Sequence, residues 1–172
     1  IEAQKIVNLP LSKIDILIHP QSLVHAIIKL NNGLTYFIYH ETSMIIPIAN
    51  AIFENNFKID DFYKLKKSKV KNNIENLEFR KVCFKLFPTV NFIKEMNRYP
   101  SAQIIVNASN EVLVDKFLRK NIDYLTIFRS IKTILNDRNY KKYAIRRPQK
   151  ITEIKEIDKW AKKTTLERLI RW

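Results

Sequence analysis

Glycine and cysteine are nearly absent from this 172-residue chain. Gly33 is the one glycine, whereas glycine averages about 7% of protein residues. A loop that cradles phosphate needs several glycines so that its backbone can approach the oxygens, which excludes a dinucleotide fingerprint or a P-loop. Cys83 is the one cysteine, so the chain can form neither an internal disulfide nor a Cys-rich zinc site. Its setting, "KVCFKLF", predicts alternating strand or core packing.

Long apolar runs are also missing. The sequence contains no stretch of about 18 uncharged apolar residues, and it does not open on a basic-then-apolar signal pattern. It therefore predicts neither a membrane span nor export, and we expect a cytoplasmic protein. With 46% hydrophobic residues, the chain can bury the core of one domain or of one and a half.

Positive charge is in large excess, with a formal net charge of +14. Clustered Lys and Arg favour polyanions, but most cations here are scattered among many Ile and Asn residues, a composition typical of A+T-rich genomes. The densest stretch, "RNYKKYAIRRPQK" at 138–150, interleaves tyrosines with cations as single-strand binders do. A solvated loop between helices is the simpler interpretation. A basic RNA- or polyanion-binding module is the alternative function, with salt-sensitive binding through Arg146 and Arg147, although nucleic acid is not the expected partner.

Local patterns predict β structure over the first 40 residues. "KIDILIHP" reads as a buried strand, and "HAIIKL-NNG-LTYFIYH" reads as a hairpin that turns at Gly33. Because side chains alternate along a strand, the first hairpin strand should carry Ala26, Ile28 and Leu30 on one face. His25, Ile27 and Lys29 should lie on the other face. Residues 44–53, "MIIPIANAIF", have helical spacing, with Pro47 tolerable only near the first turn.

A change of pattern follows. Residues 54–79 are polar, basic and Asn-rich, which predicts a linker or crossing segment. Beyond it the period is helical, over residues 89–98, 107–120, 125–137 and 158–170. Asn107 and Ser109 are suitable residues to cap the second of these helices. The sequence therefore predicts an α+β chain in which a helical bundle follows a sheet.

Two of the three histidines lie close together in "IHPQSLVHAI". His19 stands where a strand ends, a place that often carries functional side chains, but its six-residue spacing from His25 matches no standard zinc signature. Two interpretations of these histidines stay open. They could act as a catalyst or a metal ligand, or they could donate a hydrogen bond that closes a strand-loop junction. Glu2 and Asp15 are the only acids before Glu41, so no compact carboxylate pair is available for acid-base work or metal binding.

Five segments together resemble one family. "IEA", "ILIHPQSLVHAI", "NNG", "SMIIPIANAI" and "NASNEVLVDKFL" occur in the order and spacing of 1-deoxy-D-xylulose-5-phosphate reductoisomerase. The resemblance implies homodimers with an N-terminal NADPH-binding domain, a central catalytic domain that holds Mg²⁺ or Mn²⁺, and a C-terminal helical domain. It assigns residues 1–53 to the end of the mixed β-sheet catalytic domain, 54–79 to a linker and 80–172 to the C-terminal α-helical bundle.

The resemblance also implies roles for individual residues. Glu2 matches the glutamate of "IEA", His19 and His25 match the family's two histidines, and Met44 matches a methionine of the substrate-pocket wall. The first three would act as supporting residues, because metal ligands need hydrogen-bonded backing to keep their geometry. Where the family reads Gly, acid, Pro, Asp, Met, Arg, this chain reads "HETSMI" at 40–45 and lacks the proline, the aspartate and the arginine.

The family's acidic metal ligands, phosphate-binding residues and nucleotide domain all precede "IEA". The resemblance therefore implies that this chain, taken alone, binds neither NADPH nor a metal and turns over no substrate. We expect it to be a fragment or remnant, or a part completed by a separate N-terminal half. Its implied reaction is the NADPH-dependent rearrangement and reduction of 1-deoxy-D-xylulose 5-phosphate to 2-C-methyl-D-erythritol 4-phosphate, in the non-mevalonate route to isoprenoids.

Overall fold

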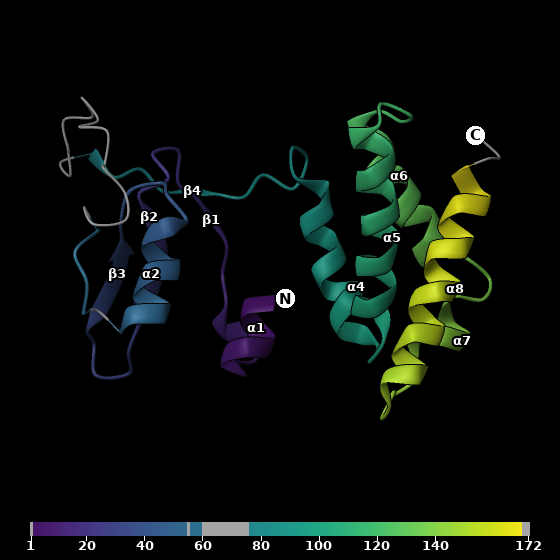
Figure 1. The fold of residues 1–172 in the computed structure, drawn as a ribbon, viewed down its shortest axis with the longest axis horizontal. Helices are drawn as coiled ribbons and strands as arrows, with labels where there is room; N and C mark the ends of the chain where they lie inside the picture. The colour runs from purple at the N-terminus through teal and green to yellow at the C-terminus, as the bar shows by residue number, and fades with distance from the viewer. Residues whose placement is uncertain (1, 55, 60–75, 170–172) are drawn as a thin grey trace. The chain divides into compact units, whose positions relative to one another are not determined.

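The computed structural model describes residues 2–54, 56–59 and 76–169 (Figure 1). The chain divides into two compact units, Glu2–Val82, here called the first unit, and Cys83–Trp172, the helical unit. The first unit mixes short helices and strands, whereas the described part of the second is built from helices, in agreement with the predicted α+β class. Much of the predicted linker over 54–79 lies outside the described residues, and the domain limits at 53 and 80 stay predictions.

Two antiparallel strand pairs form the sheet structure of the first unit. Its elements, in chain order, are α1 (Glu2–Val7), the 3₁₀ helix η1 (Leu11–Lys13), β1 (Leu17–Ile18), β2 (Val24–Lys29), β3 (Thr35–Tyr39), α2 (Ile45–Phe53) and β4 (Arg80–Lys81). β2 pairs with β3, and β1 pairs with β4. Gly33 has a φ of 89°, a left-handed conformation that suits glycine and closes the β2–β3 turn. The predicted hairpin and the helix after it are confirmed, with Pro47 in the first turn of α2.

The prediction of β structure throughout the first 40 residues is wrong at two places. Residues 2–7 and 11–13 are helical. The strand predicted in "KIDILIHP" is only Leu17–Ile18, and Leu17 is 44% exposed instead of buried. The physical reason is that, among the described strands, β1 has one neighbour, β4, which pairs with it through two residues.

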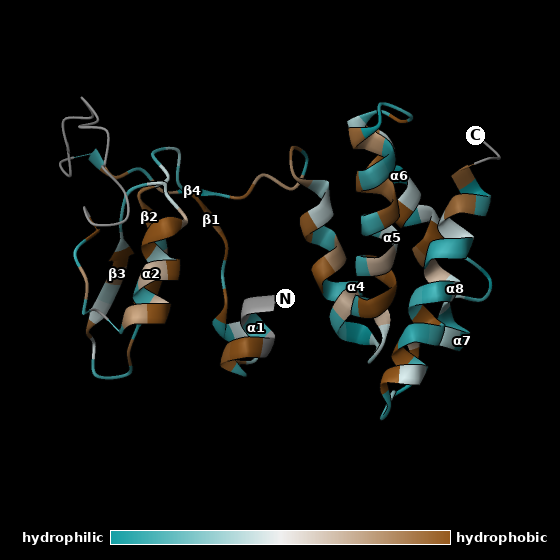
Figure 2. Ribbon diagram, in the orientation of Figure 1, coloured by the Kyte–Doolittle hydropathy of each residue, from teal (hydrophilic) through white to brown (hydrophobic). Residues whose placement is uncertain are grey.

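Much of the apolar surface of the first unit is uncovered. Phe37 on β3 is 52% exposed, and on α2 Ile48 and Ile52 are 52% and 65% exposed. Figure 2 shows the apolar colour along α2. Large apolar side chains exposed in such number on one small unit favour burial against another element or partner.

The helical unit packs around one central helix. Its elements are the 3₁₀ helix η3 (Pro88–Asn91), α4 (Phe92–Arg98), α5 (Ala102–Leu118), α6 (Tyr124–Leu135), α7 (Tyr140–Ala144) and α8 (Ile151–Leu169). α5 contacts α4, α6, α7 and α8. Because helices surround it, α5 buries residues on several sides, and alanines such as Ala102 and Ala108 let its neighbours approach closely. The fully buried side chains of Ile105, Leu113, Ile134 and Ile157 fill the core.

Helix limits differ from the predicted ones where local signals mislead. α5 begins at Ala102 instead of 107, so Asn107 and Ser109 lie inside the helix and cap nothing. α8 begins at Ile151 rather than 158, and α7 was not predicted. α6 follows its prediction closely because Asp123 caps it: its carboxylate accepts a 2.8 Å hydrogen bond from the backbone N–H of Thr126, which lowers the pKa of Asp123.

Two further features complete the helical unit. Cys83 is exposed in a turn, so the strand or core packing predicted for it is wrong. An ion pair joins the end of α8 to the segment after α6: Arg168 donates to the carboxylate of Asp137, whose side chain is 3% exposed. None of the helices among the described residues is long and apolar enough to cross a membrane.

Truncating the central helix should destabilise the helical unit strongly. Leu113→Ala leaves a cavity beside Phe92 and Ile131, with which Leu113 packs, and we expect a loss of about 2–5 kcal/mol in the free energy of unfolding. Chemical denaturation followed by circular dichroism measures it. Leu118→Ala, on the same helix but 71% exposed, is the matched control and should change stability by less than about 0.5 kcal/mol. Equal losses in the two variants would contradict this assignment of the core.

The Asp137–Arg168 pair should make stability depend on pH. Burial raises the pKa of Asp137, but the backbone N–H of Asn139 and the guanidinium of Arg168 outweigh it, so the pKa lies below its ordinary value. A lowered pKa in the folded state stabilises the protein fully above the unfolded-state value of about 3.9 and loses this contribution as pH falls through the folded-state value.

Asp137→Asn should therefore cost about 1–3 kcal/mol near neutral pH, and the difference from the parent chain should vanish in acid. Denaturation curves collected across the acid range measure the difference. Asp115→Asn, which breaks the exposed pair with Arg119, should cost less than about 0.5 kcal/mol. A penalty for Asp137→Asn that stays constant with pH would exclude this linkage.

Candidate functional site

His19 lies in the tight turn that follows β1. The carbonyl of His19 accepts a 3.0 Å hydrogen bond from Ser22 N–H, and Ser22 has a φ of 54°. The His19 ring reaches the chain that returns at β4: Nδ1 lies 2.7 Å from the carbonyl oxygen of Glu78, and the ring stacks on Phe79 with centroids 4.8 Å apart. Because a carbonyl oxygen only accepts, Nδ1 carries the proton. Nε2 is buried and has no hydrogen-bond partner.

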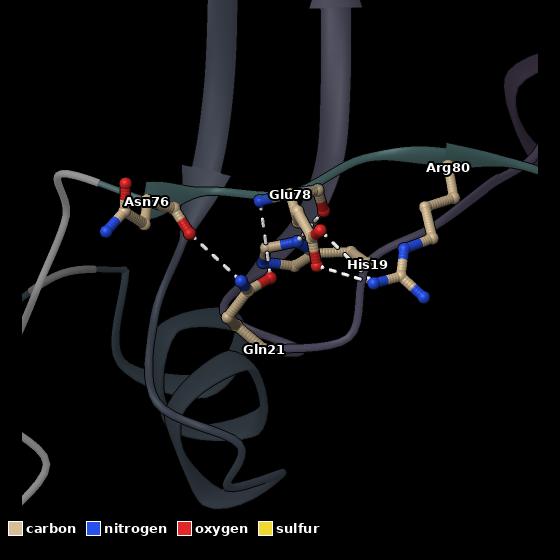
Figure 3. A network of polar contacts seen from close by, with 5 residues as sticks. All are labelled: His19, Gln21, Asn76, Glu78 and Arg80. Atoms are coloured by element: carbon tan, nitrogen blue, oxygen red, sulfur yellow. Dashed lines mark hydrogen bonds and ion pairs between the residues drawn. The ribbon is translucent and has the colours of Figure 1, made fainter.

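Gln21 contacts the same stretch of chain, residues 76–81, here called the returning segment (Figure 3). Its Nε2 donates to the carbonyl of Asn76 at 2.9 Å, and its Oε1 accepts from Glu78 N–H at 3.3 Å. Glu78 directs its own carboxylate at Arg80, with which it forms an ion pair. The "HPQS" turn therefore touches residues more than 50 positions later in the chain.

His25 lies at an irregularity in the hairpin. Val24 pairs with Tyr39 and Ala26 pairs with Ile38, so His25 is an extra residue in β2 without a partner in the ladder. Its ring stacks on His40, with centroids 3.8 Å apart and planes 13° apart, and its Nε2 lies 3.2 Å from the carbonyl of His40. His40 Nδ1 in turn donates to the carbonyl of Glu41 at 2.6 Å. Neighbouring backbone thus orients both rings.

A groove of about 770 Å³ brings the two predicted histidines together. His19 and His25 both line it, together with side chains from η1, both hairpin strands and the returning segment: Lys13, Asp15, Leu17, Val24, Ala26, Ile27, Lys29, Thr35, Phe37 and Phe79. Its floor is largely apolar, with Lys13, Asp15 and Lys29 as charged members.

The other two predicted residues are not part of this groove. Met44 precedes α2, is 71% exposed and does not line the groove. Glu2 belongs to α1, and its side chain lies outside what the structure describes. Sequence reasoning missed Phe37 and Phe79, which line the same groove, Phe79 by stacking on His19. An alternating hairpin signal could have pointed to Phe37, but Phe79 follows the polar segment and no local pattern links it to His19.

Metal-ligand chemistry is not assembled among the described residues. No group of three or more His, Cys, Asp or Glu side chains in that part of the chain converges to hold an ion. Asp15 lines the groove with the histidines, yet one carboxylate is a poor site for Mg²⁺, which binds oxygen ligands in near-octahedral geometry. These residues can supply hydrogen bonds and an apolar wall but do not fit a complete metal site.

The basic stretch at 138–150 uses its aromatic residues internally. Tyr140 is 5% exposed and belongs to the helical core. Tyr143 stacks on Trp160, with centroids 4.2 Å apart, and the guanidinium of Arg146 lies 4.6 Å from the Tyr143 ring centroid. A hydrogen bond to Glu156 at 2.9 Å raises the pKa of Arg146 and pairs its charge. Because these rings and this cation already have partners, the structure does not favour stacking on nucleobases.

Comparison with known proteins gives the same family as the sequence motifs. The model of the DXP reductoisomerase C-terminal domain matches residues 40–164. The 1-deoxy-D-xylulose 5-phosphate reductoisomerase of Pelagibacter ubique is 35% identical over 159 residues, which cover 92% of this chain and 40% of the relative. That of Leptospira interrogans serovar Lai is 32% identical over 165 residues, 95% of this chain and 40% of the relative.

Solved structures share the fold at lower identity. The reductoisomerase of Zymomonas mobilis in complex with NADPH superposes with a TM-score of 0.77 at 22% identity, covering 96% of this chain and 42% of that one. A DOX-P reductoisomerase with fosmidomycin and magnesium gives 0.80 at 22% identity, with coverages of 97% and 42%. The chain spans about 40% of the length of the curated relatives that it matches. Because the family model covers well over half of its residues, this chain belongs to the DXP reductoisomerase C-terminal domain family.

Proposed function

We propose that this chain forms the C-terminal part of a 1-deoxy-D-xylulose-5-phosphate reductoisomerase. The reaction rearranges and reduces 1-deoxy-D-xylulose 5-phosphate to 2-C-methyl-D-erythritol 4-phosphate with NADPH, in isoprenoid biosynthesis. The observation that carries the proposal is the family match over residues 40–164, joined to relatives of which the chain spans 40%. One related structure holds NADPH, fosmidomycin and magnesium together.

The ligands of metal and cofactor must then come from a segment other than the described one. In the complete enzyme Mg²⁺ or Mn²⁺ would polarise hydroxyl and carbonyl oxygens of the substrate. The residues described here hold no converging set of metal ligands. We infer that the chain alone is inactive and that its contribution is structural support for the site and a wall of its pocket.

His19 and His25 are the supporting residues of this proposal. Both rings line the groove, and backbone carbonyls orient each of them through one nitrogen. Such fixed orientation is what a residue behind a metal or substrate ligand must provide. Met44 would join the pocket wall, and Glu2 would support it from the beginning of the chain. Phe37 and Phe79 add apolar surface that excludes water from the groove.

Assembly with a partner would cover the exposed apolar surface of α2 and β3. Ile52 and Phe37 are each more than half exposed, and no other strand in the described part of the chain pairs with either edge of the β2–β3 pair. Open edges and apolar faces favour association. We propose a homodimer in the cytoplasm, or pairing with a separate N-terminal half, as the state in which this surface is buried.

The purified 172-residue chain should show no activity on its own. With NADPH, Mn²⁺ and 1-deoxy-D-xylulose 5-phosphate present, we expect NADPH absorbance to decay no faster than in a protein-free control, because the described residues bring together no set of metal ligands. Oxidation of NADPH that depends on both the substrate and the chain would contradict this proposal.

A chimera tests whether the chain can complete an active enzyme. The part of the Pelagibacter ubique enzyme that precedes its matched region would be joined to Ile1, with the native Pelagibacter enzyme as the reference. We expect substrate-dependent NADPH oxidation, and we expect His25→Ala in the chimera to lower kcat/KM about 10- to 100-fold, as loss of a supporting residue does. Lys29→Ala, another groove residue, serves as the control. A folded chimera that binds NADPH but does not oxidise it would argue against the proposal.

A further inference from the structure

Very little sheet pairing joins the returning segment to the rest of the first unit. β1 and β4 pair through only Leu17↔Lys81 and Ile18↔Arg80. Even a complete two-stranded pair is marginally stable in water, and this one closes a loop of more than 50 residues, whose ordering costs entropy. The ladder alone therefore does not explain why residues 76–81 lie beside the "HPQS" turn.

Gln21 supplies the missing contacts with its side-chain amide. Its N–H and C=O engage the backbone of Asn76 and Glu78, two residues apart, at 2.9 and 3.3 Å. A neighbouring strand offers the same donor and acceptor pair to an extended segment. The Gln21 amide thus pairs with backbone just before β4, where none of the described strands pairs with the chain (Figure 3).

His19 completes the pairing of the same backbone unit. The N–H of Glu78 donates to Gln21, and the C=O of Glu78 accepts from His19 Nδ1 at 2.7 Å. Both backbone groups of this one residue are therefore paired by side chains of the turn, although the residue itself is exposed. The next residue, Phe79, stacks on the His19 ring and lines the groove.

We propose that His19 and Gln21 form a backbone clamp, which fixes residues 76–80 and thereby positions Phe79 as a wall of the groove. Both are positioning residues that act through Phe79. The clamp contacts backbone atoms and not the side chain of Glu78. The Glu78 carboxylate pairs with Arg80 instead, and both of these side chains are more than half exposed. This role is independent of the proposed reaction, so failure of either proposal leaves the other standing.

Amide hydrogen exchange in the complete 172-residue chain tests the clamp. Gln21→Ala should make the Glu78 amide exchange about fivefold faster, the effect of losing one neutral hydrogen bond. His19→Ala should raise the exchange rate of the Glu78 amide to a similar degree. Amides of the β2–β3 hairpin, which the clamp does not touch, should stay within about twofold of the parent chain because their opening is local.

Two conservative variants separate a backbone clamp from general packing. Glu78→Gln keeps both backbone groups and removes only the ion pair with Arg80, so it should leave protection of the Glu78 amide unchanged. His19→Asn keeps an N–H donor near the position of Nδ1 and should recover most of the protection that His19→Ala loses. Exchange after Glu78→Gln as fast as after Gln21→Ala would overturn the proposal, and so would failure of His19→Asn to rescue.

A measurement on the unaltered chain keeps the proposal testable if the alanine variants do not fold. Nitrogen NMR of the His19 ring should show the proton on Nδ1, because that atom donates to Glu78. A ring proton on Nε2 alone would exclude the His19 half of the clamp. A Glu78 amide in the parent chain that exchanges as fast as one in an unstructured peptide would exclude the Gln21 half.

Discussion

Hydrogen bonds from two side chains to the backbone of Glu78 are the interaction on which the groove depends. The His19 ring donates to the C=O of Glu78, and the Gln21 amide oxygen accepts from its N–H. The next residue, Phe79, stacks on the His19 ring. The short β1–β4 ladder cannot hold this segment by itself. Without these contacts the groove would lose the wall that comes from the far side of the polar segment, and His19 would lose its orientation.

The two units differ in how completely they bury their own apolar surface. The helical unit encloses α5 and has fully buried residues such as Ile105 and Leu113. Among the described residues of the first unit, Val24 and Ala49 alone belong to the buried apolar core, while α2 and β3 leave large side chains exposed. The helical unit therefore closes its own core, whereas the first unit leaves apolar surface exposed. The chain spans about 40% of the length of the relatives that it matches.

Several of the basic residues behind the high net charge form ion pairs in the structure. The net charge of +14 suggested a polyanion, but Arg146 pairs with Glu156, Arg168 pairs with Asp137, and Lys162 pairs with both Glu111 and Asp158. Tyrosines within the basic stretch are used for packing. Motifs such as "IHPQS" therefore identify the family better than net charge does, because they depend on particular side chains meeting particular partners.

The sequence by itself determined those features that arise from neighbouring residues. The hairpin at Gly33 follows from alternation and a turn residue, α2 from helical spacing with Pro47 in its first turn, and α6 from the helical period of its residues. Family membership also follows from motif order. The start of α5 at Ala102 was misplaced because burial among other helices extends this helix beyond its local signals. The first turn of α8 is exposed, and there the Glu153 carboxylate accepts from the backbone N–H groups of Gln149 and Lys150 just before Ile151.

Only the tertiary structure decided what the two histidines contact. Local sequence left His19 and His25 as either ligands or junction residues, and it contained no signal for Glu78 and Phe79 as partners of His19. Hydrogen bonds across 55 to 59 positions depend on how the chain returns, and periodicity within a window of a few turns carries no information about that path. His25 was equally undetermined, because the bulge that turns it toward His40 arises from the register between two strands.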